Sequence, residues 1–247
     1  MANSLVDKYN AKYSTDIKVH VDTNKQLEVL KYLESKAIDT RNLVRHEENT
    51  SLSNINDLSI QAEEGFRIIS DAFPSLGGTY SRPKLSLYSQ IYDTLGLEAR
   101  YFILTNEVSI SKNLPDIYRP FLVSKYMAYQ RGIAREDEAT FFAYLAGINN
   151  TNPNIKYSAY VSILSMMTQS MMLDNKVEYN YFVSNMNKDI RADMEKISSY
   201  RSKTGVSQRL IDQIKYNFKR VNGDLRVDSL EKEVSILMSS YYSLFTY

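Results

Sequence analysis

Residues 115–147 read PDIYRPFLVSKYMAYQRGIAREDEATFFAYLAG, and this stretch decides the fold class of the chain. Apolar residues recur in it at helical spacing on both sides of Gly132, which predicts a helix over 116–131 and another over 136–148. Helical spacing then continues, so the remainder of the chain is expected to be helical as well. The further helices are expected over 156–173, 177–197, 205–221 and 229–245.

The first third of the chain also has helical periodicity. We expect a helix over 24–47 and a second one over 53–69, with Ser53 or Asn54 as its N-cap. Pro74 ends this pattern and opens the segment 74–83, PSLGGTYSRP, whose Gly and Pro residues predict a loop.

Between this loop and residue 114 the pattern changes to that of strands. Residues 100–104 and 107–110 are rich in β-branched and aromatic residues, and Thr105-Asn106 separates them. The expected fold class is therefore mainly α, in α+β form, with a small β-hairpin or short sheet around residues 100–110. We divide the chain into an N-terminal helical segment, 1–52, and a main domain, 53–247, and expect the two to form one compact unit.

Composition excludes several classes of function. The chain has 247 residues, with 30 Lys and Arg against 29 Asp and Glu, so its net charge of +1 gives no reason to expect a nucleic-acid partner. It has no Cys, which excludes disulfides, thiolate nucleophiles and Cys-based zinc sites. No run of 18 apolar residues occurs, so no membrane span is expected in this chain.

The two histidines restrict the possible chemistry further. His20 and His46 are 26 positions apart, so the chain cannot contain the HExxH helix of zinc peptidases. Both lie in polar segments, and no Gly-x-Ser-x-Gly elbow or glycine-rich phosphate loop accompanies them. We therefore expect no resident metal or cofactor.

The segment around residue 125 nevertheless resembles a known pattern. Its sequence KYMAYQRG, followed by AREDEATF, resembles an uncharacterised bacterial family of membrane-anchored zinc metallopeptidases, in which the matching stretches read HEMAHQRG and AREDEANF. The resemblance covers about residues 55–245. It extends to G-x-Y-x-R-P-K at 78–84, N-L-P-D at 113–116, V-N-G-D at 221–224 and S-Y-Y at 240–242.

The departures from this family lie at the positions that would carry its chemistry. Lys125, Tyr126 and Tyr129 stand where the resemblance implies a zinc-binding His, a catalytic Glu and a second His. An ammonium repels Zn²⁺, and a Tyr phenol is a poor zinc ligand. Glu136 and Glu138 remain as the acidic candidates for a third ligand, and Glu136 is favoured.

These substitutions lead to a structural prediction. We expect Lys125 to replace the charge of the metal by pairing with Glu136 or Glu138 across the turn at Gly132. Tyr126 and Tyr129 would then fill the vacated volume and donate their hydroxyls to the same carboxylates. The alternative is that Lys125 extends to solvent and that both tyrosines are ordinary surface residues.

Three hypotheses of function follow. The leading one is a proteolytically inactive metallopeptidase homologue that binds a peptide or protein partner, or another copy of itself, in a retained cleft. The possible cleft residues are Gly77, Gly78, Tyr80, Arg82, Tyr101 and Val108. The second is a hydrolase without metal that uses Lys125, Tyr129 and Glu136, and the third is a plain helical interaction module. By resemblance alone, the expected location is extracytoplasmic or membrane-associated.

Overall fold

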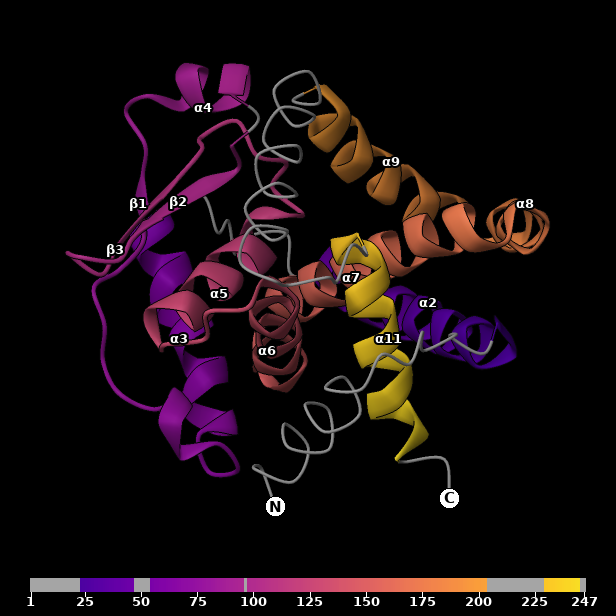
Figure 1. Ribbon diagram of the computed structural model, residues 1–247, viewed down its shortest axis with the longest axis horizontal. Helices are drawn as coiled ribbons and strands as arrows, with labels where there is room; N and C mark the ends of the chain where they lie inside the picture. Colours follow the sequence, from indigo (N-terminus) through magenta and orange to yellow (C-terminus); the bar gives the residue numbers. More distant parts are fainter. Residues whose placement is uncertain (1–22, 47–53, 96, 204–228, 245–247) are drawn as a thin grey trace, which may run out of the picture.

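The computed structural model describes residues 23–46, 54–95, 97–203 and 229–244, except for the side chains of 45, 46, 202 and 203. In these ranges the protein is mainly helical with a small sheet, which confirms the expected fold class (Figure 1). The helices are α2 (Thr23–His46), α3 (Ile55–Ile69), α4 (Ser89–Leu95), α5 (Arg119–Gln130), α6 (Glu136–Asn149), α7 (Pro153–Asp174), α8 (Lys176–Asn185), α9 (Lys188–Lys203) and α11 (Leu230–Ser243), with a 3₁₀ turn η1 (Pro74–Leu76). The strands are β1 (Lys84–Leu85), β2 (Ala99–Phe102) and β3 (Glu107–Ile110).

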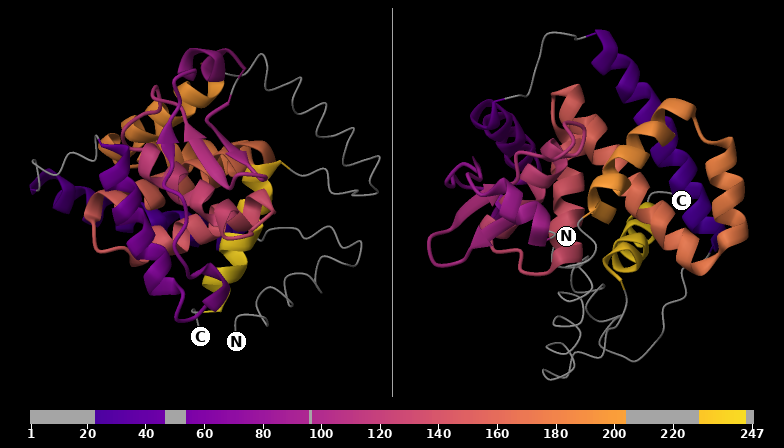
Figure 2. Two further views of the ribbon diagram at one scale, coloured as in Figure 1. Left: turned by 90° about the vertical axis from the view of Figure 1, so that its left-hand side faces the viewer. Right: turned by 90° about the horizontal axis from the view of Figure 1, so that it is seen from above.

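Helix α7 forms the centre of the helical part, and α2, α6, α9 and α11 pack against it (Figures 1 and 2). It is buried on nearly every side, as its apolar residues and interspersed serines allow close approach by several neighbours. Leu30 and Leu33 of α2 are fully buried in the same hydrophobic core as Leu164 of α7. The described part of the N-terminal segment therefore shares one core with the main domain.

Side-chain caps fix where two of these helices begin. Asn54 accepts a hydrogen bond from the backbone N–H of Asn56 at 2.9 Å, which confirms it as the N-cap of α3. Ser53, the other candidate, lies outside the described residues. Asn152 caps α7 in the same way, by accepting from Asn154 at 2.8 Å, and Pro153 occupies the first helical position.

The sheet has the strand order β1-β3-β2. The expected hairpin is present, with β2 antiparallel to β3 and Arg100 opposite Ser109. Residues 84–85, for which neither a strand nor a helix was expected, form β1, which pairs in parallel with β3. The inward side chains of β2 and β3, such as Val108 and Ile110, are buried, and both strands pack against α5.

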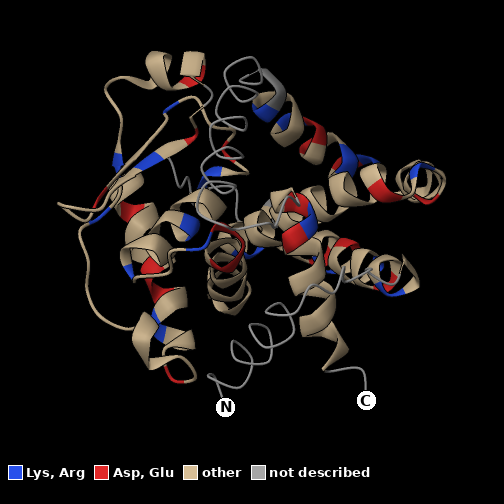
Figure 3. Cartoon of the chain, in the orientation of Figure 1, with Lys and Arg blue, Asp and Glu red and all other residues tan. Residues whose placement is uncertain are grey.

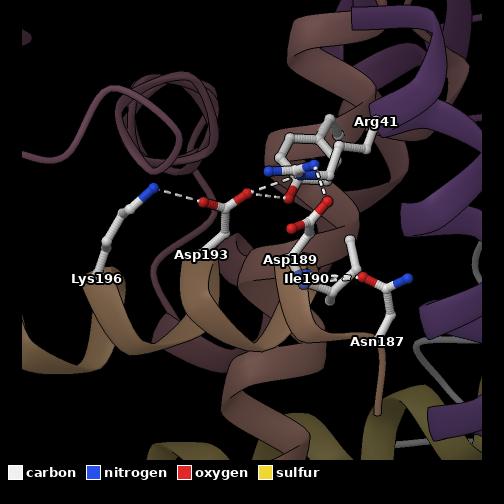
Figure 4. A network of polar contacts seen from close by, with 7 residues as sticks. Arg41, Asn187, Asp189, Ile190, Asp193 and Lys196 are labelled. Atoms are coloured by element: carbon white, nitrogen blue, oxygen red, sulfur yellow. Dashed lines mark hydrogen bonds and ion pairs between the residues drawn. The ribbon is translucent and has the colours of Figure 1, made fainter. Parts of the chain in front are cut away.

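The single helix expected over 177–197 is wrong, because the chain forms α8 and α9 instead. Met186 is extended at the end of α8, with ψ 148°. Asn187 then starts a new helix by accepting hydrogen bonds from the N–H groups of Asp189 and Ile190 (Figure 4). Helix α4, between the loop and β2, was also not expected.

A buried carboxylate attaches α9 to its neighbours. Asp193 of α9 accepts hydrogen bonds from Arg41 of α2 at 3.0 Å, Tyr157 of α7 at 2.6 Å and Lys196 at 2.7 Å. Figure 4 shows Arg41 reaching over α9 to both Asp193 and Asp189, the latter at 2.8 Å. One carboxylate thus joins three helices.

Several expectations concern residues that the structure does not describe. The helix over 205–221, the V-N-G-D segment at 221–224 and His20 all lie outside the described residues. No helix in the described ranges is both long and apolar enough to cross a membrane.

Candidate functional site

The candidate site lies where α5 is followed by α6. Helix α5 ends at Gln130, and Gly132 adopts φ 86°, a conformation that glycine reaches at little cost, before α6 begins at Glu136. This short turn places the first residue of α6 beside the last turns of α5. Lys125 Nζ lies 3.0 Å from Glu136 Oε1, so the expected ion pair across Gly132 is confirmed.

The two partners differ in burial. The side chain of Lys125 is 7% exposed, which rules out the alternative in which it extends to solvent, whereas that of Glu136 is 42% exposed. Burial lowers the pKa of Lys125, but the negative charges of Glu136 and Glu98 outweigh burial and raise the pKa above its ordinary value. The ammonium is therefore held in its charged form, which is neither a base nor a nucleophile.

Tyr126 points toward the sheet. Its hydroxyl donates to the backbone carbonyl of Ala99 in β2 at 2.9 Å, so the expectation that it donates to a site carboxylate is wrong. The reason is that β2 packs against α5 and presents a backbone acceptor there. Burial raises the pKa of Tyr126 well above its ordinary value, which keeps the phenol protonated.

Tyr129 is placed by aromatic contacts. Its ring stacks on Tyr101 of β2, with centroids 6.1 Å apart and planes 12° apart, and meets Tyr126 edge-on at 5.3 Å. Burial raises its pKa strongly, and the nearby carboxylates Glu136 and Asp137 add to this effect. The ring therefore serves as packing beneath β2.

The other acidic candidate belongs to a different pair. Arg135 Nε lies 3.4 Å from Glu138, and its guanidinium also binds the buried Asp137 at 2.6 Å. Of the two predicted carboxylates, Glu136 alone is the one that pairs with Lys125.

A second set of charges, which the sequence did not indicate, lies near Lys125. Glu98 accepts a hydrogen bond from the Tyr118 hydroxyl at 3.0 Å and lies 3.6 Å from Arg201 Nε of α9. Arg201 also contacts Glu231 of α11 at 2.9 Å. Burial lowers the pKa of Arg201, but the surrounding oxygens outweigh burial and raise it. The partners lie far apart in sequence, so no local motif could have indicated them.

A resident metal does not fit these side chains. In the part of the chain that the structure describes, no group of three or more His, Cys, Asp or Glu could hold a metal ion. At the position itself, the cation beside Glu136 is the ammonium of Lys125.

A comparison with protein families matches residues 6–224 to the model described as "Protein of unknown function (DUF3810)". The chain belongs to this family. The matched range includes the sheet and the whole α5–α6 pair. No curated protein and no solved structure matches the chain.

In this DUF3810 chain, the two residues after Tyr129 have structural roles. Gln130 Nε2 donates to the carbonyls of Ser81 and Asn106, both at 2.8 Å, and so ties the loop and the hairpin turn to α5. The Arg131 guanidinium lies between the rings of Phe66 and Tyr80, at 4.3 and 4.6 Å, and donates to the Leu76 carbonyl. These contacts explain the presence of Gln130 and Arg131 in the motif without a zinc ion.

The expected cleft residues have different surroundings. Tyr101 contacts Tyr129, but Tyr80 packs on Arg131 and Val108 is only 1% exposed, so it is a core residue. Gly77 is half-buried, and Gly78 and Arg82 are exposed on the loop.

Two surface hollows lie elsewhere. One is between the 113–117 segment and α9, and the other is between α3 and the 150–153 segment. Neither of them is lined by Lys125, Tyr126 or Tyr129.

Proposed function

We propose that this chain is a proteolytically inactive relative of zinc metallopeptidases that works by binding a peptide or protein partner. The observation that carries the proposal is the Lys125–Glu136 pair. A buried ammonium stands 3.0 Å from the carboxylate that the resemblance assigns to zinc, so the charge that a metal would bring is already present.

The directions of the pKa shifts count against the alternative hydrolase. That hypothesis needs a lowered pKa at Lys125, so that a neutral amine is present near neutral pH. The pKa of Lys125 is raised instead, and burial raises that of Tyr129 as well.

The outer edge of β2 supports a binding role. Ser111 N–H donates to the Glu98 carbonyl, so by the alternation of an antiparallel pair the backbone groups of Ala99 and Tyr101 point away from β3. The Ala99 carbonyl already accepts a hydrogen bond from the Tyr126 hydroxyl. Within the described part of the chain, the outward N–H and C=O of Tyr101 carry no hydrogen bond, and an extended peptide could pair with them.

A zinc titration by calorimetry tests the loss of the metal site. We expect no zinc binding by the wild-type protein at micromolar concentration. The double variant Lys125→His/Tyr129→His, which keeps Tyr126 on Ala99, should gain stoichiometric zinc binding through both imidazoles and Glu136. The matched control adds Glu136→Gln and should bind more weakly.

Tight, stoichiometric zinc in the wild-type protein would overturn the proposal. A folded double variant that binds no zinc would contradict the proposed relationship to zinc peptidases.

Selection of peptides from a random display library on the immobilised protein tests the binding role. Tyr101→Pro removes the outward N–H without breaking the hydrogen bonds to β3, since proline is tolerated on a strand edge. This variant should bind the selected peptides more weakly. Tyr101→Ala, which keeps the N–H and loses the ring, is the control. A selection without enrichment would contradict the proposal.

A further inference from the structure

Three consecutive large apolar side chains project from the end of β2 and the turn that follows it. Phe102, Ile103 and Leu104, which we name the hairpin tip, are 42%, 80% and 100% exposed. Single exposed apolar residues are ordinary, but turns normally carry Gly, Asn, Asp, Ser or Pro. The hairpin end projects from the body of the molecule in Figure 1 and again in the right-hand view of Figure 2.

Hydrogen bonds to Asn106 fix the turn that carries the hairpin tip. Asn106 adopts the left-handed region at φ 53°. Its side-chain oxygen accepts a hydrogen bond from the Tyr101 hydroxyl at 2.9 Å. Its carbonyl accepts from Gln130 at 2.8 Å and from Ser81 at 2.8 Å. The three apolar side chains are therefore presented to solvent by an ordered turn.

The surroundings of the tip carry more positive than negative charge. Arg82, Lys84 and Arg100 are exposed there, and Lys84 pairs with Glu107 at 3.0 Å (Figure 3). The Arg100 guanidinium lies 5.2 Å from the centre of the Phe102 ring. This leaves local basic charge on a chain whose net charge is only +1.

A second group of exposed apolar residues adjoins the sheet. It lies on and just before α4, which borders the same face of the molecule in the left-hand view of Figure 2. Its members are Leu87, Tyr88, Ile91 and Leu95, which are 84%, 67%, 53% and 46% exposed.

We propose that the hairpin tip docks on the surface of an anionic phospholipid bilayer. A projecting apolar tip can enter the boundary between headgroups and acyl chains, where its side chains leave water without needing a complementary pocket. The arginines beside it would meet the negative surface potential of the lipid. The docking is peripheral, and it does not depend on the peptide-binding function proposed above.

Co-sedimentation with lipid vesicles tests this inference. The full chain should bind vesicles of phosphatidylcholine mixed with phosphatidylglycerol more strongly than vesicles of phosphatidylcholine alone, and added salt should weaken the binding. Ile103→Ser/Leu104→Ser should lower the partition coefficient about ten-fold or more, because two apolar side chains no longer enter the lipid. Arg82→Gln/Arg100→Gln should lower it for the anionic vesicles only.

The matched control removes two exposed apolar residues elsewhere. Leu173→Ser/Val177→Ser, at positions 68% and 77% exposed, should leave the binding unchanged. The proposal is overturned if the wild-type protein binds neither kind of vesicle, if both lipids bind equally, or if the tip variant and the control behave alike. Light scattering identifies the competing occupant, because a tip that joins two copies would make the wild-type protein dimeric and the tip variant monomeric without any lipid.

Discussion

Lys125 and Glu136 form an ion pair whose two members have different access to water. Lys125 is almost fully buried, whereas nearly half of the Glu136 side chain is exposed. A buried charge that loses its partner is expensive, while an exposed carboxylate that loses its partner is hydrated by solvent. The stability of the site should therefore depend on which member is removed.

Glu136→Gln should lower the free energy of unfolding by about 2–3 kcal/mol, and Lys125→Met should lower it by about 1 kcal/mol or less. Urea denaturation of both variants measures the difference. Because the pKa of Lys125 is raised by folding, its contribution is fully present below its unfolded pKa of about 10.4 and is lost as pH rises through the folded value. Equal losses in the two variants would contradict this account of the pair.

At the scale of elements, a buried carboxylate joins helix α9 to two neighbouring helices. Asp193 is only 4% exposed and accepts hydrogen bonds from residues of α2, α7 and α9. Burial raises its pKa, but the bonds from Lys196, Tyr157 and Arg41 outweigh burial and lower it. Asp189 binds the same Arg41 but is half-exposed, so it serves as the matched control.

Asp193→Asn should destabilise the protein by about 2–4 kcal/mol, whereas Asp189→Asn should cost about 1 kcal/mol or less. The contribution of Asp193 is present above its unfolded pKa of about 3.9 and is lost as pH falls through its lower folded value. Urea unfolding from neutral to acid pH measures both effects. A steeper acid loss in the Asp193 variant than in the wild-type protein would disprove the linkage.

At the scale of the whole molecule, the described part of the N-terminal segment belongs to the same core as the main domain. Leu33 of α2 is fully buried, and α2 packs along α7. A shared core leads us to expect one cooperative unfolding transition rather than two.

Leu33→Ala should therefore lower the free energy of unfolding by about 2–5 kcal/mol. The midpoint of the whole transition should fall with it. Far-UV circular dichroism and tyrosine fluorescence should give coincident curves. Two separate transitions, with only one of them shifted, would instead support 1–52 and 53–247 as independent units.

Local patterns in the sequence determined most of the secondary structure, and the resemblance indicated one contact of the site. Apolar spacing, caps and β-branched runs predicted most of the helices and the hairpin, because these signals act over a few residues. The resemblance led us to expect Lys125 to pair with Glu136 or Glu138, and the pair that forms is with Glu136, 11 residues away across a short turn.

Contacts between distant segments were decided by the tertiary structure alone. Tyr126 donates to Ala99, 27 residues away, and Arg201 joins Glu98 to Glu231. Such contacts depend on how sheet and helices pack, which local periodicity does not specify. The same packing buries Val108 and leaves Leu104 in water, although both lie in one short apolar hairpin.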